Sequence, residues 1–354
     1  MSIVQHLGKK TGDISAILLA HYDVHARTLP WRVPPGGGLP DPYHVWMSEI
    51  MLQQTTVAAV ISYFEKFTAR WPGFAQLAAA QDADVMAAWA GLGYYARARN
   101  LLKCARVVVD QYGGFLPQSE AELLKLPGIG PYTAAAITAI AFGQRAVVVD
   151  ANVERVVTRL FAIGQALPAA KPAIRAAMDA ITPHARSGDF AQAMMDLGAG
   201  LCSVKSPQCA RCPLAPFCTA HQAGQAELYP VKPLKKDKPL RQGTAFWVQR
   251  EGHILLVKRA NKGMLADMRA LPDDGWTARS DGDGQPPFAA NWQLSDKIVQ
   301  HSFTHFTLEM RIAVTEGPPR ADFGEYWPIN SLDKAGLPTL FSKAIRAILA
   351  ERRD

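Results

Sequence analysis

The stretch SEAELLKLPGIGPYTAAAITAIAF, residues 119–142, says most about the fold of this chain. Ser119 and Glu122 have the spacing of a capping box, which predicts the start of a short helix. The sequence Pro-Gly-Ile-Gly then interrupts the helical pattern, and the alanine-rich part that follows predicts a second helix from Thr133 to Phe142. We therefore predict two helices joined by a tight glycine hairpin.

The hairpin glycines, Gly128 and Gly130, suggest what this turn could bind. A glycine turn at a helix N-terminus lets backbone N–H groups approach a phosphate without an intervening side chain. Such contacts do not depend on base sequence, so Gly128 and Gly130 are predicted to contact nucleic-acid phosphate. An ordinary helix–helix connection is the alternative that these residues alone leave open.

Length and composition indicate a folded protein of ordinary class. The 354 residues suffice for two or three hydrophobic cores, and 49% hydrophobic with 19% charged residues is typical of globular proteins. No uncharged apolar run of about 18 residues occurs, and residues 1–13 lack the apolar core of a secretion signal. We expect no membrane partner and a cytoplasmic, bacterial-type protein, associated with the nucleoid and monomeric.

The net charge of +7 favours a polyanionic partner, and it is unevenly distributed. The segment VKPLKKDKPLR, residues 231–241, contributes +4, whereas residues 242–354 are neutral by formal count. Prolines in this segment disfavour helix, so we predict an extended, basic linker. Nucleic acid is the expected partner, although a solvated tether without a ligand also explains the segment.

Hydrophobic spacing changes at this linker. Residues 12–200 show apolar side chains at three- and four-residue intervals, as in amphipathic helices. Residues 243–260 place two strand-like runs around a Glu251–Gly252 turn, and HFTLEMRIAVTE (residues 305–316) is a further strand candidate. The prediction is a mainly α region over 1–225, a linker over 226–241 and a smaller α+β domain over 242–354.

Four of the five cysteines form a C-x6-C-x2-C-x5-C array over residues 202–218. Closely spaced thiolates can bind one metal centre, and disulfides are disfavoured without a secretory signal. The ligand number alone does not separate zinc from a 4Fe-4S cluster, but zinc sites usually pair two short Cys-x2–4-Cys knuckles. The spacing therefore favours a 4Fe-4S cluster. Its predicted ligands are Cys202, Cys209, Cys212 and Cys218. The fifth cysteine, Cys104, is predicted to be a buried small hydrophobic residue.

The hairpin motif LPGIG, the aspartate Asp150 and the cysteine loop occur in the order found in the helix-hairpin-helix superfamily of DNA base-excision glycosylases, which this chain resembles. Further segments resemble the MutY family of adenine glycosylases. These are LPWR (29–32), WMSEIMLQQT (46–55), GLGYYARARN (91–100), VDANVERV (149–156) and QAMMDLGA (192–199). Residues 242–354 are similar to the Nudix-like C-terminal domain of that family.

The resemblance implies a base-excision repair enzyme that acts on double-stranded DNA. It would hydrolyse the N-glycosidic bond of adenine mispaired with 8-oxoguanine or with G. This chemistry needs a proton donor facing the base and negative charge facing the sugar. Glu49, whose neighbours are apolar, is predicted to be the acid, because such a setting raises the pKa of a carboxyl. Asp150 precedes a helical pattern that starts near Val153 and is predicted to face the cationic sugar, by electrostatics or as a transient nucleophile.

Tyr132 separates two kinds of glycosylase. Bifunctional relatives similar to endonuclease III carry a lysine two residues after the second hairpin glycine, where its amine forms a Schiff base. Tyr132 occupies that position here and cannot form an imine, so a monofunctional enzyme is expected. The resemblance also implies that Tyr132 can hydrogen-bond Asp150, and that Asn152 supports the same aspartate.

Base extrusion requires a wedge and a pocket. The resemblance implies that Tyr94 intercalates beside the oxidised guanine, and Arg97 and Arg99 are candidates for phosphate contact. The residues expected to line the adenine pocket, or to fill the space that adenine leaves, are Trp31, Arg32, Leu52, Gln53 and Gln54.

The segment HSFTHF, residues 301–306, resembles the Phe-Ser-His loop with which this family reads 8-oxoguanine. Phe303, Thr304 and His305 match that loop, with threonine replacing serine, so the hydroxyl is kept and a methyl is added. Residues 262–275 lack the acidic run of a Nudix metal helix. The C-terminal domain is therefore expected to recognise the lesion without hydrolysing nucleotides.

Two other interpretations remain open. The first is a pyrimidine-damage glycosylase/lyase similar to endonuclease III, which Tyr132 and the C-terminal domain disfavour. The second is a non-catalytic iron-sulfur protein that binds DNA or transfers electrons. Glu49 and Asp150, each in motif context, disfavour the second, because a binding protein needs neither carboxyl group.

Overall fold

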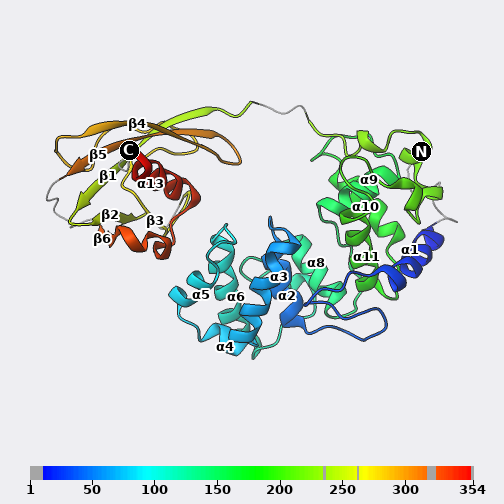
Figure 1. Ribbon diagram of the computed structural model, residues 1–354. Coiled ribbons are helices and arrows are strands. Elements are labelled where there is room, and N and C mark those ends of the chain that lie inside the picture. The colour runs from blue at the N-terminus through cyan, green and yellow to red at the C-terminus, as the bar shows by residue number, and fades with distance from the viewer. Residues whose placement is uncertain (1–10, 234–236, 261–262, 317–323, 352–354) are drawn as a thin grey trace. The chain divides into compact units, whose positions relative to one another are not determined.

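The computed structural model describes residues 11–233, 237–260, 263–316 and 324–351. The chain divides into two compact units, Met1–Lys235 and Lys236–Asp354. The first unit is built of helices and the second around a β-sheet (Figure 1), which confirms the predicted fold class. No helix in the described ranges has both the length and the apolar character that a membrane span requires.

The first unit consists of helices connected by turns and by loops of different lengths. They are α1 (Thr11–His25), α2 (Pro42–Leu52), α3 (Val57–Arg70), α4 (Phe74–Ala78), α5 (Asp82–Ala88), α6 (Ala96–Tyr112), α7 (Glu120–Leu123), α8 (Pro131–Ile140), α9 (Ala151–Leu160), α10 (Lys171–Ile181), α11 (Ser187–Ala199) and α12 (Thr219–Gln222). Helix α8 is the central one, because every residue from Thr133 to Ile140 is buried. It packs against α2, α7 and α11, and its small side chains allow close approach.

The glycine hairpin lies directly before this central helix. Ser119 Oγ accepts a hydrogen bond from Glu122 N at 3.3 Å, as the capping-box spacing predicts. The second helix begins at Pro131, two residues earlier than predicted, because proline is well tolerated in the first turn of a helix. The hairpin is thereby held directly against the core.

The two hairpin glycines have different roles. Gly128 has φ +80°, and a Cβ there would lie 2.8 Å from Asn100 Cβ, so a larger residue would be both strained and crowded. Gly130 is the N-cap of α8, and a Cβ there would meet nothing within 4 Å. Gly130 therefore leaves the backbone accessible, whereas Gly128 makes the turn possible.

The second unit is a mixed sheet with one long helix. Its strands are β1 (Leu240–Arg250), β2 (His253–Lys258), β3 (Arg269–Ala270), β4 (Gln293–Ser302), β5 (Thr307–Glu316) and β6 (Glu325–Pro328), followed by α13 (Thr339–Glu351). The strand order is β3-β2-β1-β5-β4, and β6 pairs with β2. Strands β1 and β5 run parallel, from Leu240 opposite Thr307 to Gln249 opposite Glu316.

The predicted hairpin around Glu251–Gly252 is confirmed. Strands β1 and β2 pair antiparallel with Arg250 opposite His253. Glu251 and Gly252 have φ +46° and +75°, as a tight two-residue hairpin turn requires. Strand β1 begins at Leu240, so the last two residues of segment 226–241 belong to the sheet. Helix α13 packs on β4 and buries an apolar face.

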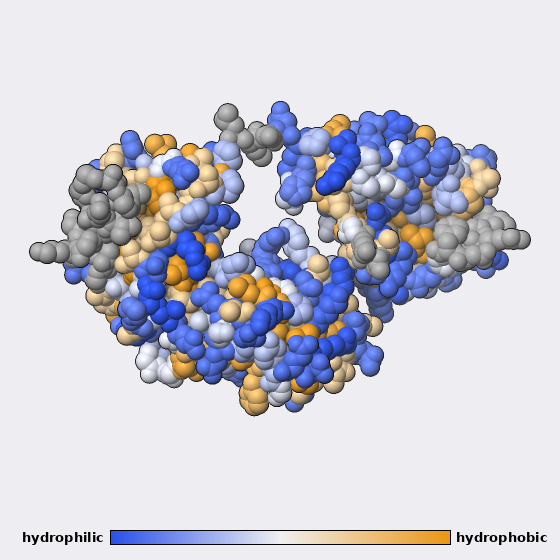
Figure 2. Space-filling view, turned by 180° about the vertical axis from the view of Figure 1, so that it is seen from behind, coloured by the Kyte–Doolittle hydropathy of each residue, from blue (hydrophilic) through white to orange (hydrophobic). Residues whose placement is uncertain are grey.

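The face of the molecule in Figure 2 is largely hydrophilic, with small hydrophobic patches.

Candidate active site

A cavity of about 680 Å³ lies among helices α2, α8, α9 and α11 of the first unit. Segment 27–32, which precedes α2, and the turn between α2 and α3 complete its wall. The residues predicted for catalysis and for the adenine pocket all line it. They are Trp31, Arg32, Glu49, Leu52, Gln53, Gln54, Tyr132, Asp150 and Asn152. Folding thus brings together residues that are distributed over more than 100 positions of the sequence.

Glu49 sits in α2 with only 6% of its surface exposed. Burial raises its pKa to about 7, with a smaller contribution from the negative charge of Asp150, while a hydrogen bond from Tyr132 and the charge of Arg32 act in the opposite direction. Its Oε2 atom has no hydrogen-bond partner in the part of the chain that the structure describes. The carboxyl group therefore holds a proton near neutrality and has an oxygen available for a ligand.

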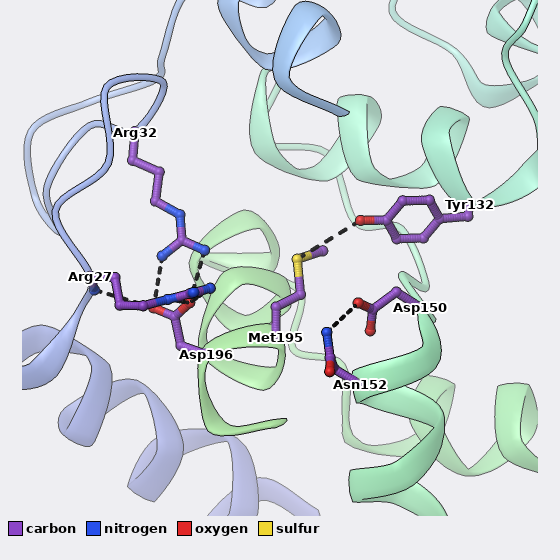
Figure 3. Close-up of polar contacts among 7 residues, drawn as sticks. All are labelled: Arg27, Arg32, Tyr132, Asp150, Asn152, Met195 and Asp196. Carbon is purple, nitrogen blue, oxygen red and sulfur yellow. Dashed lines mark hydrogen bonds and ion pairs between the residues drawn. The ribbon is translucent and has the colours of Figure 1, made fainter. Parts of the chain in front are cut away.

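Asp150 is the N-cap of α9, which begins at Ala151 and not near Val153 as predicted. Its Oδ1 accepts a hydrogen bond from Val153 N at 2.7 Å, and its Oδ2 accepts one from Asn152 Nδ2 at 2.9 Å (Figure 3). A helix N-terminus favours negative charge, and both donors stabilise the carboxylate. The cavity thus contains one acid that holds its proton and one carboxylate in a setting that favours the anion.

Tyr132 follows the hairpin and points its phenol into the cavity (Figure 3). Its hydroxyl donates to Met195 Sδ at 3.9 Å and lies against Glu49. Burial, with the nearby charges of Glu49 and Asp150, raises the pKa of Tyr132 well above its ordinary value. The phenol therefore stays neutral and acts as a hydrogen-bond donor. The bond to Asp150 that the resemblance implies stays a prediction.

Arg27, which lines the cavity, and Asp196 of α11, which accepts a hydrogen bond from it, are residues that the sequence did not indicate. Arg32 donates from Nη1 to Asp196 Oδ2 at 2.7 Å and from Nη2 to Oδ1 at 2.9 Å, and Arg27 Nε donates to Oδ1 at 2.6 Å (Figure 3). Burial opposes ionisation of Asp196, but the hydrogen bonds and charges of Arg32 and Arg27 outweigh it, so its pKa is lowered. The ion pair between Arg32 and Asp196 therefore holds segment 27–32 against α11.

Two further lining residues, Gln192 and Met195, also come from α11. Gln192 is 6% exposed, and its Nε2 donates to the Gly188 carbonyl at 3.3 Å. An amide within the apolar run Phe190–Met195 is the signal by which the sequence could have indicated it. The segment QAMMDLGA contains Gln192, Met195 and Asp196. The resemblance gave none of these three residues a role.

Tyr94 and Arg97 flank the start of α6. The ring of Tyr94 is 57% exposed, so it is free to contact a ligand. The prediction that Arg97 contacts phosphate is wrong, because its guanidinium is buried and donates to protein oxygens such as the Met51 carbonyl at 2.7 Å. The first turn of α6 directs this side chain inward, toward the end of α2.

The predicted lesion-reading residues lie in the second unit, on the turn between β4 and β5. Phe303 stacks on Phe306 with ring centroids 4.7 Å apart and packs near Trp276, so it anchors the turn in the core of this unit. Thr304 and His305 at the tip are exposed. Of the three residues, only these two present their side chains fully to a ligand.

The cysteine loop is attached to α9 by two arginines. Arg155 Nε donates to the Cys202 carbonyl at 2.7 Å, and its Nη2 donates to Asn152 Oδ1 at 3.0 Å. Arg159, 2% exposed, donates from Nη1 to Cys202 Sγ at 3.2 Å and to the Ser203 carbonyl at 2.6 Å. Arg155 therefore contacts both the loop and the residue that supports Asp150.

The thiols of the loop are free, and the helical cysteine Cys104 is fully buried, as predicted. Burial and neighbouring thiols raise the pKa of Cys212 to about 11, and the same causes raise those of Cys209 and Cys218. Among the described ranges, no group of three or more His, Cys, Asp or Glu side chains is placed so as to hold a metal ion.

Comparison with known proteins identifies both units. Residues 47–183 match the family model of the HhH-GPD superfamily of base excision DNA repair proteins, and residues 244–347 match that of the NUDIX domain. Among solved structures, a thermostable thymine-DNA glycosylase is 29% identical with a TM-score of 0.54, covering 61% of this chain and 98% of that one. A trapped endonuclease III–DNA covalent intermediate is 26% identical with a TM-score of 0.51, covering 60% and 98%.

Curated relatives narrow the assignment. The adenine DNA glycosylase of Mycobacterium tuberculosis is 39% identical over 266 residues, covering 73% of this chain and 82% of the relative. That of Buchnera aphidicola from Schizaphis graminum is 30% identical over 310 residues, covering 84% and 85%. The human adenine DNA glycosylase is 36% identical over 327 residues, and the match spans 77% of this chain but only 60% of the human protein. The chain belongs to the adenine DNA glycosylase family of base-excision DNA repair proteins.

Proposed function

We propose that this protein, acting as a monomer, removes adenine mispaired with 8-oxoguanine or G from double-stranded DNA by hydrolysing the N-glycosidic bond. The observation that carries the proposal is the pair of carboxyl groups in one cavity. Burial keeps Glu49 protonated near neutrality, whereas the N-terminus of α9 favours the anion of Asp150. A cavity of about 680 Å³ has room for an extruded nucleoside.

In the proposed reaction, Glu49 transfers its proton to a ring nitrogen of the extruded adenine. The glycosidic bond then breaks with its electron pair moving to the protonated base, and positive charge develops on the sugar. Asp150 stabilises that charge, and water completes the substitution at the anomeric carbon, releasing a proton that returns Glu49 to its acid form. Tyr132 and Asn152 hold Glu49 and Asp150 in place through the hydrogen bonds described above.

The remaining predicted positions have proposed roles in DNA binding. Backbone groups at Gly128 and Gly130 would contact a phosphate, and the open space around Gly130 supports this. Gln53 and Gln54 would occupy the helix position that adenine leaves, and Gln53 Nε2 already bonds Thr133 Oγ1 at 3.3 Å. Trp31, Arg32 and Leu52 would contact the extruded base, and Tyr94 would insert beside the lesion.

The second unit is the proposed lesion-recognition domain. Thr304 and His305 would contact the oxidised base, and Phe303 would hold their turn in place through its stacking on Phe306. In this proposal residues 1–225 form the catalytic region, residues 226–241 the basic linker and residues 242–354 the recognition domain.

The proposed function is tested by single-turnover assays on two duplexes. One has adenine opposite 8-oxoguanine and the other has adenine opposite G. Adenine should be released from both, and faster from the first. A duplex with an oxidised pyrimidine serves as the comparison substrate, because an endonuclease III-like enzyme would prefer it. Release of the oxidised pyrimidine with adenine left intact would contradict the proposal.

Lyase activity is a separate prediction. Because Tyr132 carries no amine, borohydride reduction of a reaction mixture should trap almost no protein–DNA adduct. The measurement is a denaturing gel of labelled duplex, with a bifunctional glycosylase/lyase as the positive control. Efficient trapping would reveal an amine nucleophile elsewhere in the cavity and would overturn the monofunctional assignment.

The proposed cofactor is a 4Fe-4S cluster held by Cys202, Cys209, Cys212 and Cys218. The donor type fits, because these are four free cysteines within the single loop 202–218, and thiolates are the usual ligands of such a cluster. Binding would draw their side chains together, since within the described ranges they are not gathered into a metal-holding group. When bound, a cluster would fix the conformation of the loop. Arg155 and Arg159 already fasten that loop to α9.

Purified protein should therefore contain about four irons per chain and absorb visible light. Cys212→Ala should lose both the iron and the colour, since one ligand is missing, whereas Cys104→Ala should keep both because Cys104 lies in α6. The iron content and the visible absorption spectrum are measured for wild type and for both variants. A colourless protein with a single zinc would contradict the assignment of the four cysteines to a 4Fe-4S cluster.

A further inference from the structure

Arg97, in the first turn of α6, makes an unusual set of contacts for a buried cation. The residue is 8% exposed, and its guanidinium bonds acceptors at the end of α2, in the turn after α2 and in the loop before α6. From Nη1 it donates to the carbonyls of Ile50 (3.2 Å) and Met51 (2.7 Å), and from Nη2 to Thr55 Oγ1 (2.9 Å) and the carbonyls of Leu92 (3.1 Å) and Gly93 (3.3 Å).

The first loop is the turn between α2 and α3. The last carbonyls of a helix have no partner within the helix, and Arg97 supplies one for Ile50 and Met51. The Thr55 hydroxyl, which accepts from Arg97, also donates to the Gln53 carbonyl at 3.3 Å. Between them, Gln54 has φ +58°, a left-handed conformation that surrounding contacts must hold.

The second loop carries Tyr94. Its φ is +48°, so this residue too is in the left-handed region while its ring is exposed. Arg97 bonds the Gly93 carbonyl, to which Trp89 Nε1 also donates at 3.0 Å. The Arg97 Cζ lies 5.5 Å from the centroid of the Tyr94 ring. The same guanidinium thus holds the backbone at the base of this exposed ring.

Stability alone does not account for Arg97. Each of the acceptors named above is a neutral oxygen, and burial lowers the pKa of Arg97. Its Nε has no hydrogen-bond partner within the ranges that the structure describes. A buried cation of this kind is weak evidence for a contribution to stability, because its desolvation penalty is large. What the guanidinium provides is a rigid, planar link between two strained turns.

We propose that Arg97 is a positioning residue that holds the Gln53–Gln54 turn and the Tyr94 loop at a fixed separation. The two elements then enter the duplex as one unit, so engagement of the lesion side favours extrusion of the paired adenine. The inference rests on the proposed function, because it assigns the two loops to base extrusion and lesion-side insertion.

The test compares Arg97→Lys with Arg106→Lys. Arg106 lies on the same helix and donates to the Ala78 and Ala80 carbonyls at 3.2 and 3.1 Å, away from both probing loops. A lysine ammonium cannot reproduce the fork of contacts at position 97, so extrusion should be about 30-fold less favourable, the effect of losing one charged hydrogen bond. Arg106→Lys should stay within about twofold of wild type.

Extrusion is measured by the fluorescence of 2-aminopurine placed opposite 8-oxoguanine, and chemistry by adenine release. A second duplex has adenine opposite an abasic site, where the unpaired base leaves the stack more readily. Arg97→Lys should lose about 30-fold on the paired duplex and less than about threefold on the unpaired one. The pH profile set by Glu49 should not move.

Equal losses on the two duplexes, or none on either, would overturn the role of Arg97. Thr55→Val removes only the hydroxyl acceptor in the extrusion turn and should give a smaller loss, about tenfold, confined to the paired duplex. If Arg97→Lys does not fold, Thr55→Val still tests the role of Arg97. If wild type released no adenine, the proposed function would fail, while the fluorescence change on binding would still decide the role of Arg97.

Discussion

Glu49→Gln is expected to lower the single-turnover rate of adenine release about 10³-fold, the range over which a positioned general acid acts. Glutamine keeps the size and the buried position of the side chain, but it has no proton to transfer. The measurement is a single-turnover time course on the duplex with adenine opposite 8-oxoguanine. Glu65→Gln on the exposed face of α3 is the control and should match wild type. A fully active Glu49→Gln protein would remove the central claim.

The same group sets a pH dependence of activity. The acid must be protonated to act, and its pKa is about 7. The rate should therefore be highest below neutrality and decline as pH rises through about 7, until other groups take over at the acidic end. In Glu49→Gln this limb of the pH profile should be absent. A wild-type profile that rises with pH across this range would contradict the assignment of Glu49 as the acid.

Stability should change with pH in the same direction. The pKa of about 7 in the folded state lies above the ordinary value of 4.5, so between these values the folded protein holds a proton that the unfolded chain releases. Its contribution to the free energy of unfolding is fully present below pH 4.5 and decreases, by roughly 3 kcal/mol in total, as pH rises to about 7. Urea unfolding at pH 5 and pH 8 should show a smaller decrease for Glu49→Gln than for wild type.

Much of this site follows from local sequence. The glycine hairpin, the apolar neighbours of Glu49 and the helical pattern after Asp150 act over a few residues, so periodicity and capping rules are enough to indicate them. The start of α9 was misplaced, because Asp150 itself is the N-cap that the rules place one residue before a helix. Even this error leaves the carboxylate at the N-terminus, where the anion is favoured.

Contacts between distant segments could not be predicted in this way. Arg32 and Asp196 are 164 positions apart, and no local pattern indicates that they pair. Arg97 was expected to be a candidate for phosphate contact, which requires an exposed side chain. Only the packing of α6 against the end of α2 turns it inward. Strand β4 was not predicted, because its side chains are mostly polar and exposed and show no alternation.

Asp150→Asn is the second large effect, and it separates charge from structure. Asparagine is as good an N-cap as aspartate, so its Oδ1 can still accept from Val153 N and α9 should keep its stability. The amide has no negative charge to stabilise the sugar cation, and its NH2 group replaces the oxygen that accepts the hydrogen bond of Asn152. We expect a loss of about 10³-fold in the rate of adenine release, comparable to removing a principal electrostatic element of an active site.

Asp150→Ala completes the comparison, because it removes the charge and the cap together. Its rate should be as low as that of Asp150→Asn, while its free energy of unfolding should fall by about 1 kcal/mol, the usual value of an N-cap. Binding of a duplex that cannot be cleaved should be nearly unchanged in Asp150→Asn, because the charge acts on the developing sugar cation and not on the uncharged sugar of the intact substrate. If Asp150→Asn kept its rate and only Asp150→Ala lost it, the aspartate would matter to this protein as a helix cap, and the group that faces the sugar would have to be sought elsewhere in the cavity.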